Sequence, residues 1–330
     1  MISPKMISSW PKTTEVYAKK VLEAETRVRP YVRETYLESS RYLSNLGHAR
    51  VHLKMEHLQH TGSFKLRGAI NKILSLSSDE LKQGIITASN GNHGMAVCFA
   101  AKQVGTSPTV YMKKGVSAER IQLIHDLGGR TKLFGVNPVE AEIKARAVAS
   151  RRDQVFISPY NDKEVIAGQG TIGVELHRQL EDIDAVFVAV GGGGLVSGIA
   201  SYLKAKLPQV RIIGCWPENS RVLFESIRAG RVIDFPETPT ISESTAGGIE
   251  NGSITLDLCR NLIDDYVLVS EAEILHAMKL IMSEERTIVE GAAGVAVAAY
   301  IKEQQKYRGE SVVILLCGRN TNIETLRKTL

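Results

Sequence analysis

Between residues 84 and 157 short apolar runs alternate with amphipathic stretches, and this alternation restricts the fold more than any other feature of the chain. Short, mostly apolar runs at 85–87, 109–112 and 155–157, and the mixed run at 131–134, predict strands. Helical spacing of apolar residues predicts helices over 94–105, 118–127 and 139–151. Strands that alternate with helices pair in parallel, and the helices cover both faces of their sheet. The sequence therefore predicts an α/β fold.

The alternation returns after residue 166. The predicted helices are 169–180, 195–205, 221–229, 255–263, 271–285 and 290–304, and the predicted strands are 185–190, 211–214 and 312–316. The run Ala185 to Val190 is apolar throughout, as expected for a strand covered on both faces. We expect two open parallel-sheet domains: a discontinuous large domain of residues 1–83 and 161–330, and a small domain of residues 84–160.

Three less regular stretches complete the prediction. A helix is expected over 12–27, ended by Pro30, and the strands 36–37 and 50–54 are expected to flank a polar turn around Asn45 to Gly47. Residues 158–166 are expected to be irregular. Residues 230–253 lack periodicity and are rich in Pro, Ser, Thr and Gly. A loop of that length inside a compact protein often has a function.

Charge and cysteine content exclude several classes of protein. The net charge is only +5 over 330 residues, and the charges are scattered, which argues against nucleic acid or a membrane surface as a partner. The four cysteines are far apart and show no C-x-x-C spacing, so neither zinc nor a disulfide framework is indicated. No signal-peptide core and no apolar run of membrane-spanning length occurs. We expect a cytoplasmic protein with free thiols.

Lys65 stands where a loop becomes a helix. Gly62 and Ser63 predict the loop and an N-cap, and apolar residues then recur at helical spacing to Leu74. The first turn of a helix lies at the positive end of its dipole, which disfavours the charged form of a lysine. A partly desolvated amine of this kind can form a Schiff base. Taken alone, a solvated surface lysine is the commoner case.

Four consecutive glycines, Gly191 to Gly194, follow an apolar strand and open a helix with Leu195. Backbone amides at such a helix start can converge on a phosphate. The spacing is neither that of the dinucleotide-binding G-x-G-x-x-G motif nor that of a P-loop. The alternative explanation is a turn whose glycines merely allow close packing.

Two further loops follow predicted strands. The polar run Ser89-Asn90-Gly91-Asn92-His93 begins a helix and could hold a carboxylate, although Asn and Gly are also common in ordinary turns. Cys317-Gly318-Arg319-Asn320 follows the last strand, at the sheet edge where α/β proteins bind ligands. Alone, Cys317 would be interpreted as a core thiol.

In this order, the lysine loop, the polar loop, the tetraglycine loop and the cysteine loop resemble the pyridoxal-phosphate enzymes of fold type II. The particular resemblance is to the serine/threonine dehydratase (threonine ammonia-lyase) group, which includes serine racemase. It runs from about residue 20 to the C-terminus, with further matching stretches at 165–172, 264–270 and 289–294. It implies a tryptophan synthase β-like fold, pyridoxal 5'-phosphate as cofactor, a small-molecule amino acid substrate and a homodimer.

The resemblance also implies a role for each motif. Lys65 is expected to form the Schiff base with the cofactor and to move the Cα proton. The expected cofactor contacts are Phe64 near the ring, Asn92 at the phenolic oxygen, Gly191, Gly192, Gly193, Gly194 and Leu195 at the phosphate, and Cys317 at the pyridine nitrogen. The expected substrate-carboxylate contacts are Ser89, Asn90, Gly91 and His93. Gly247 or Gly248 and Glu290 are expected near the ring or the substrate.

Three departures from the family pattern refine these expectations. Asn90 stands where racemases of the group carry a serine, and an amide cannot act as an acid–base group, which disfavours racemisation. Trp216 stands where many members hold a cation with a glutamate, so we expect no metal site of the family type; Glu218 would substitute only after a local shift. Residues 242–253 depart from the stretch usual in threonine dehydratases and are similar instead to dehydratase-like proteins of hydroxyectoine utilisation. We also expect no regulatory domain after Asn320.

These observations favour a lyase that eliminates water from a β-hydroxy amino acid, threonine-like, serine-like or hydroxyectoine-derived, to give a 2-oxo acid and ammonia. A racemase-type isomerase is the first alternative. A nucleotide-binding oxidoreductase that uses the tetraglycine loop is the second. The sequence does not fix which hydroxy amino acid is accepted, or whether effectors act on the enzyme.

Overall fold

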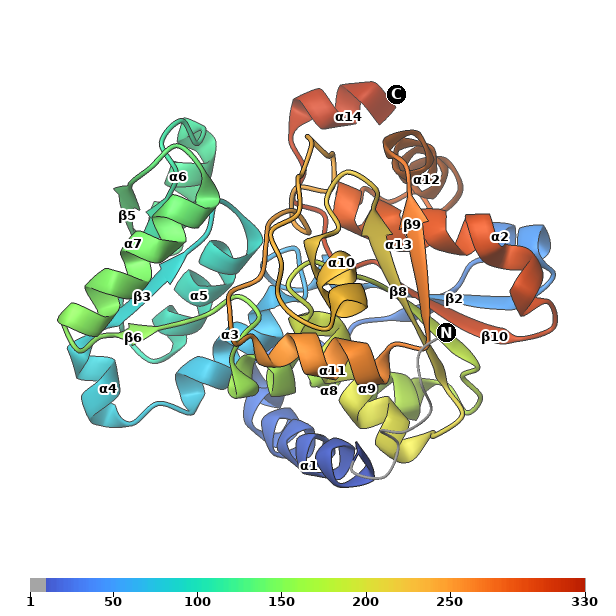
Figure 1. Ribbon diagram of the computed structural model, residues 1–330, viewed down its shortest axis with the longest axis horizontal. Coiled ribbons are helices and arrows are strands. Elements are labelled where there is room, and N and C mark those ends of the chain that lie inside the picture. Colours follow the sequence, from blue (N-terminus) through green and yellow to red (C-terminus); the bar gives the residue numbers. More distant parts are fainter. Residues whose placement is uncertain (1–9, 330) are drawn as a thin grey trace.

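The computed structural model describes residues 10–329, which contain two sheets (Figure 1). The larger sheet has the strand order β1 (Leu37–Ser39), β2 (Arg50–Lys54), β10 (Ser311–Leu315), β7 (Ala185–Ala189), β8 (Arg211–Pro217) and β9 (Asp265–Val269). The smaller sheet has the order β5 (Arg130–Leu133), β4 (Thr109–Met112), β3 (Ile85–Ala88) and β6 (Val155–Phe156). Only the β1–β2 pair is antiparallel. The predicted two-sheet α/β fold is confirmed.

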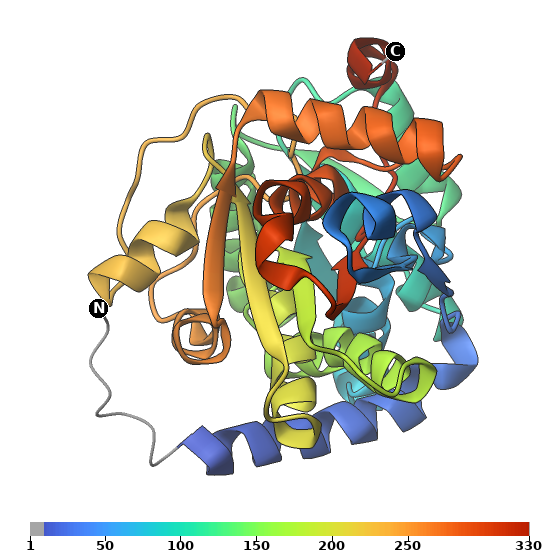
Figure 2. The ribbon, with the colours of Figure 1, turned by 90° about the vertical axis from the view of Figure 1, so that its right-hand side faces the viewer.

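Helices cover both faces of the larger sheet. On one side lie α12 (Glu271–Glu284) and α13 (Gly291–Glu303), and on the other lie α1 (Trp10–Val28), α8 (Lys163–Gln179) and α9 (Gly194–Lys206) (Figure 1). In Figure 2, α1 runs along the lower edge and α14 (Ile323–Thr329) lies at the top. The β7 strand is buried throughout, as its continuous apolar run predicts.

The smaller sheet is covered in the same way. On one face Ile86, Ala88 and Tyr111 pack against α7 (Pro138–Arg151), and on the other Val110 and Met112 pack against α5 and α6. The bounds are Asn92–Gln103 for α5 and Ala118–Asp126 for α6, and α4 (Ser78–Gln83) lies beside β6. The remaining helices are α2 (Arg41–Gly47), α3 (Lys65–Leu74), α10 (Val222–Ala229), α11 (Ile254–Leu262) and the short 3-10 turns η2 (Arg29–Tyr31), η3 (Glu56–Leu58) and η4 (Gln304–Tyr307).

Several local predictions were wrong, each for an identifiable reason. The turn expected at Asn45 to Gly47 is the end of α2, whose start is capped by Ser40 accepting from the Leu43 N–H. Ser63 does not cap α3, because Phe64 holds the N-cap position and makes no side-chain cap. Part of the stretch expected to be irregular belongs to α8, which Asp162 caps through two backbone N–H groups. The elements β9, α4 and α14 were missed.

Helices α3, α8 and α9 pack backbone to backbone. A Cβ added at Gly168 would lie 2.4 Å from the carbonyl oxygen of Arg67, and one at Gly198 would lie 2.3 Å from that of Ile166. A Cβ at Gly170 would meet the Gly198 carbonyl at 2.8 Å. Only glycine allows helices to approach this closely. The contact fixes the start of α3 relative to the start of α9, and these two starts carry Lys65 and the tetraglycine loop.

A buried ion network holds the first turn of α3 in place. The Arg67 guanidinium contacts the carboxylates of Glu56 and Glu175, each at 2.7 Å, and Lys54 contacts Glu175 at 2.5 Å. All four side chains are fully buried. Charges without solvent must be paired to be tolerated. Because Arg67 lies two residues after Lys65, the network anchors the helix that presents the lysine.

Within residues 10–329, no helix is both long enough and apolar enough to cross a membrane. The four cysteines are free and buried, in agreement with the sequence prediction.

Candidate active site

Lys65 is the first residue of α3, which lies between the two sheets (Figure 1). Its amine donates a hydrogen bond to the carbonyl oxygen of Pro159 at 2.9 Å and lies 5.2 Å from the centre of the Phe64 ring. Burial lowers the pKa of Lys65 to about 8, although the Cys317 and Glu290 side chains act to raise it. Lys65 is therefore much closer to neutrality at physiological pH than an exposed lysine is.

The loop before Lys65 is fastened to the loop after β10. Ser63 and Gly318 form an antiparallel bridge, and the Phe64 N–H donates to the carbonyl oxygen of Cys317 at 3.1 Å. The Cys317 side chain is buried, and burial raises its pKa well above the usual range. The thiol thus keeps its proton, although the positive charge of Lys65 acts to lower the pKa of Cys317.

Asn92, the first residue of α5, has partners on both ends of its amide. Its Nδ2 donates to the two carboxylate oxygens of Glu290 at 3.0 and 2.9 Å, and lies 3.3 Å from the hydroxyl of Ser244. Its Oδ1 accepts from Asn320 Nδ2 at 2.7 Å, and that nitrogen also donates to the Thr61 carbonyl at 2.9 Å. The polar loop, the cysteine loop and the lysine loop therefore meet at Asn92.

His93 is neutral in this arrangement. Burial, and then the positive charge of Lys65, lower the pKa of His93 to about 3. Its Nε2 lies 3.1 Å from the carbonyl oxygen of Ile157, so a neutral ring must donate from Nε2 to that carbonyl. The buried Nδ1 has no partner among the described residues. The imidazole can accept a hydrogen bond there, but it supplies no positive charge to a carboxylate.

The rest of the polar loop is held by its own contacts. The Gly91 N–H donates to the hydroxyl of Ser89 at 3.1 Å, and Asn90 Oδ1 accepts from the Lys113 N–H at 3.0 Å. No atom lies within 4 Å of the position that a Cβ on Gly91 would occupy. Open space therefore exists at the point where the sequence predicts a substrate carboxylate.

The tetraglycine loop opens α9. Gly193 takes the N-cap position with φ of 84°, a left-handed conformation that glycine adopts without strain. Among residues 10–329, no acceptor receives a hydrogen bond from the backbone N–H groups of Gly191 to Leu195. Leu195 itself is buried, and its side chain packs in the core of the larger sheet.

Two residues outside the predicted set of site residues pack against the tetraglycine loop. A Cβ on Gly192 would lie 2.4 Å from Cγ of Tyr160, and one on Gly191 would lie 2.9 Å from Cα of Thr245. The sequence contains only weak signals for these neighbours. Tyr160 follows the strand β6, at the ligand-binding edge of a sheet, and Thr245 lies in the long aperiodic loop.

These features fit the expected cofactor. A run of backbone amides at a helix N-terminus, without partners in the described part of the chain, suits a phosphate, and the glycines let the loop pack closely against Tyr160 and Thr245. A buried amine of lowered pKa suits attachment of an aldehyde. The site therefore provides donors for the phosphate and an amine for the aldehyde, both on the helices that pack against α8.

Other residues singled out in the sequence have contacts of their own. Gly248 is exposed, and Gly247 donates its N–H to Glu237 at 3.0 Å in an exposed segment. Trp216 is buried and stacks on Tyr266, with ring centres 5.8 Å apart. Within residues 10–329, no three His, Cys, Asp or Glu side chains are grouped so that they could hold a metal ion. The absence of a family-type metal site stays a prediction.

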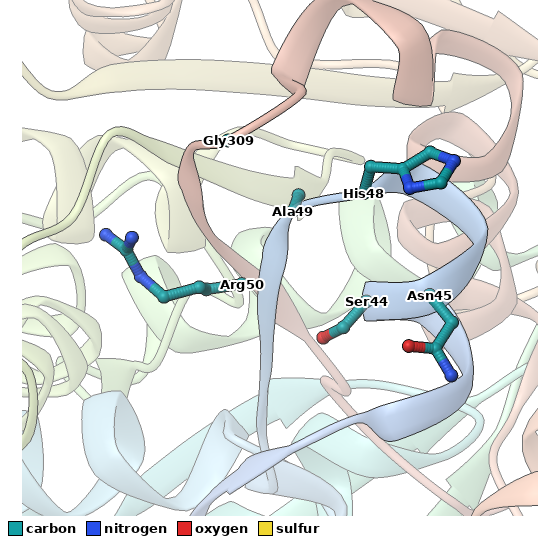
Figure 3. Close-up of a pocket in the computed structure, with 6 residues that line it drawn as sticks. All are labelled: Ser44, Asn45, His48, Ala49, Arg50 and Gly309. Carbon is teal, nitrogen blue, oxygen red and sulfur yellow. The ribbon is translucent and has the colours of Figure 1, made fainter.

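A surface pocket lies apart from these residues (Figure 3). It is lined by Ser44, Asn45, His48, Ala49, Arg50 and Gly309. None of these is a predicted site residue, and the Arg50 side chain extends away from Ser44 and Asn45. The chemistry-bearing side chains gather instead between the two sheets.

Comparison with known proteins identifies the family. Residues 28–318 match the family model described as pyridoxal-phosphate dependent enzyme. The chain is 36% identical to the L-threonine ammonia-lyase of Thermotoga maritima, over 94% of this chain and 77% of the relative. It is 34% identical to the catabolic L-threonine dehydratase of Escherichia coli, over 92% of each chain.

Solved structures agree with the sequence relatives. Threonine deaminase isoform 2 of Solanum lycopersicum superposes with a TM-score of 0.91 and 33% identity, over 96% of this chain and 92% of that one. Maize serine racemase superposes with a TM-score of 0.89 and 30% identity, over 94% and 96%. The alternative of a nucleotide-binding oxidoreductase is left without support. The chain belongs to the family of pyridoxal-phosphate dependent enzymes, and pyridoxal phosphate is its cofactor.

Proposed function

We propose that this enzyme is a lyase of the threonine dehydratase type, which removes water from a β-hydroxy amino acid and releases a 2-oxo acid and ammonia. The observation that carries the proposal is the Lys65 amine, which is buried at the start of α3 and has a pKa lowered to about 8 by that burial. The names of the Thermotoga maritima and Escherichia coli relatives support the same reaction.

Each group of the site has a task in this reaction. When bound, pyridoxal phosphate supplies the sink for the electron pair that remains after the Cα proton is removed. The amides of Gly191 to Leu195 would hold its phosphate, Asn92 would bind its phenolic oxygen, and Phe64 would lie near its ring. Lys65 Nζ takes the proton from Cα as general base.

Cys317 directs the outcome toward elimination. Because burial raises its pKa, the thiol would be a poor proton donor to the pyridine nitrogen that it is expected to face. An unprotonated ring withdraws electrons less strongly than a protonated one. That suits a reaction in which the departing hydroxide takes the electron pair with it.

The start of α5 is proposed to bind the substrate carboxylate, through Ser89, Asn90, Gly91 and His93. The open space at Gly91 gives room for a ligand there, and a helix N-terminus favours an anion. His93 is neutral and its Nε2 donates to Ile157, so its Nδ1, unpaired within residues 10–329, can only accept a hydrogen bond; it would border the carboxylate without forming an ion pair or donating to it.

Residues 242–253, here named the substrate loop, are proposed to contact the substrate side chain. Ser244 lies against Asn92 and Thr245 lies against Gly191, so the loop borders both ends of the cofactor site. Its similarity to dehydratase-like proteins of hydroxyectoine utilisation suggests a hydroxylated amino acid derivative as an alternative to threonine or serine.

A panel of β-hydroxy amino acids, including L-threonine, L-serine and hydroxyectoine-derived compounds, tests the proposal. We expect 2-oxo acid and ammonia in equal amounts from at least one of them. Formation of neither product from any compound would overturn it. The Lys82→Ala variant, which changes an exposed lysine paired with the exposed Asp79, serves as the control for a Lys65→Ala variant that loses the activity.

The isomerase alternative is distinguished in deuterium oxide. A racemase exchanges the Cα hydrogen for deuterium with inversion, whereas a lyase releases deuterated oxo acid. Two-faced proton transfer needs an acid–base group opposite the lysine. Asn90 is an amide whose Oδ1 already accepts from Lys113, so we expect little inversion.

The boundaries of the two domains, at residues 83/84 and 160/161, are part of the proposal, as are a homodimer and a cytoplasmic location. The free buried cysteines fit a reducing compartment. Light scattering on the purified protein tests the dimer, since a mass near that of one chain, 36.2 kDa, would contradict it.

A further inference from the structure

The segment Pro159 to Asn161 contacts three parts of the site at once. Pro159 accepts the hydrogen bond from the Lys65 amine at 2.9 Å. Asn161 donates from Nδ2 to the carboxylate of Glu250 at 2.8 Å and accepts from the Ile254 N–H at 3.0 Å. Tyr160 lies between these two residues, and both its ring and its hydroxyl make contacts.

The ring of Tyr160 is a wall of the tetraglycine loop. A Cβ on Gly192 would come within 2.4 to 2.8 Å of three ring atoms, and one on Gly194 would come within 2.9 Å of the Tyr160 Cα. The side chain is only 9% exposed. Removal of the ring would open a void directly beside the backbone amides that are proposed to bind phosphate.

The hydroxyl of Tyr160 holds the substrate loop. It accepts a hydrogen bond from the Glu250 N–H at 2.9 Å. The Glu250 carboxylate also binds the Arg146 guanidinium at 2.8 Å, on helix α7 beside the smaller sheet. Burial raises the pKa of Tyr160, so its hydroxyl remains protonated and neutral.

We propose that Tyr160 is a positioning residue that links the substrate loop to the phosphate-binding glycines, its ring shaping the glycine loop and its hydroxyl fixing residues 242–253. This inference rests on the proposed function only in that the loop is taken to contact the substrate. It predicts that mutation can separate two effects of this side chain. The ring governs the affinity for the cofactor, and the hydroxyl governs the order of the substrate loop.

Two variants separate these effects. Tyr160→Phe keeps the ring and removes the hydroxyl, whereas Tyr160→Leu removes both. Tyr300→Phe is the matched control, because the Tyr300 hydroxyl also makes one buried hydrogen bond, to the Leu43 carbonyl, in the core of the larger sheet. A general loss of stability would affect the control as much as Tyr160→Phe.

The first measurement is hydrogen exchange of residues 242–253 in the holoenzyme, which does not depend on turnover. In Tyr160→Phe we expect exchange in this loop to rise roughly three- to tenfold, the usual effect of one lost hydrogen bond. Tyr300→Phe should leave the loop unchanged. Equal exchange in wild type and Tyr160→Phe, or an equal rise in the control, would overturn the proposal.

The second measurement is the Kd of the apoprotein for pyridoxal phosphate. We expect a Kd within about twofold of wild type for Tyr160→Phe, and a rise of roughly tenfold or more for Tyr160→Leu, from the lost packing. A Kd that rises equally in both variants would contradict the division between ring and hydroxyl. Once a substrate is known, Tyr160→Phe should raise KM more than it lowers kcat. If no substrate is found, the exchange and Kd results still decide the role of Tyr160.

Discussion

The amide nitrogen of Asn92 lies 3.0 and 2.9 Å from the two carboxylate oxygens of Glu290, deep between the two sheets. A buried carboxylate is costly unless its oxygens accept hydrogen bonds. Burial raises the pKa of Glu290, while Asn92 acts to lower it. The contact therefore orients the Asn92 amide and stabilises a negative charge near Lys65.

This charge gives the first prediction. The rate at which Lys65 is acylated in the apoprotein can be measured at a series of pH values by peptide mass spectrometry. We expect this rate to show a midpoint near pH 8, because burial lowers the pKa of Lys65 from 10.5. The neutral amine reacts, so the rate rises with pH through that midpoint. Glu290→Gln removes a charge that raises the pKa of Lys65, so its midpoint should be lower still.

Glu284→Gln, which removes an exposed charge at the end of α12, is the control and should leave the midpoint in place. A wild-type midpoint near 10.5, or an upward shift in Glu290→Gln, would contradict the electrostatic account of the site.

The tetraglycine loop gives the second prediction. In Gly192→Ala the added methyl group would lie 2.4 Å from the Tyr160 ring, so either the ring or the loop must move. Titration of the apoprotein with pyridoxal phosphate should show a Kd raised roughly tenfold or more. Gly105→Asn is the control, since that glycine faces open space and asparagine tolerates its φ of 70°. Unchanged affinity in Gly192→Ala would mean that the loop is not the phosphate site.

The buried ion network gives the third prediction. Glu175→Gln leaves Arg67 and Lys54 short of a negative partner, so the free energy of unfolding should fall by about 3–5 kcal/mol in urea melts at pH 7. Lys82→Ala, at an exposed pair, should change it by less than about 0.5 kcal/mol. A Glu175→Gln protein as stable as wild type would show that the network does not anchor α3.

The same carboxylate should make stability depend on pH. Burial alone would raise the pKa of Glu175, but Arg67 and Lys54 outweigh burial and lower it from 4.5 to about 2. A depressed carboxyl pKa stabilises the fold above the unfolded value and loses that contribution as pH falls through the folded value. Wild type should therefore lose stability between about pH 4.5 and 2, and Glu175→Gln should lose less over the same range. Equal losses would contradict the assignment.

Sequence periodicity predicted most of the fold, because the strands β3, β7 and β10 are buried throughout and are mostly apolar. Periodicity failed where a capping residue decides the structure. Ser40 caps helix α2 where a turn was expected, and Asp162 caps α8 inside a stretch expected to be irregular. β9 was missed because it begins with Asp265 and Tyr266, which are only half buried, and its apolar run is therefore short.

The candidate site divides in the same way into residues that local motifs indicate and residues that they do not. Lys65, Asn92, the tetraglycine loop and Cys317 come from short motifs at strand ends and helix starts, which a sequence displays directly. Tyr160 and Ser244 act through contacts with segments far away in the chain, Tyr160 with Glu250 and Ser244 with Asn92. Such long-range neighbours leave no periodic signal, and only the folded structure brings them together.

The most direct test of the account is to reduce the holoenzyme with borohydride, digest it and find the lysine that carries the cofactor by mass spectrometry. We predict that the peptide containing Lys65 carries the pyridoxyl phosphate adduct. We also predict that the absorbance band of the protonated Schiff base is absent in Lys65→Ala. An adduct on a different lysine, or a Lys65→Ala protein that keeps the band, would contradict the account.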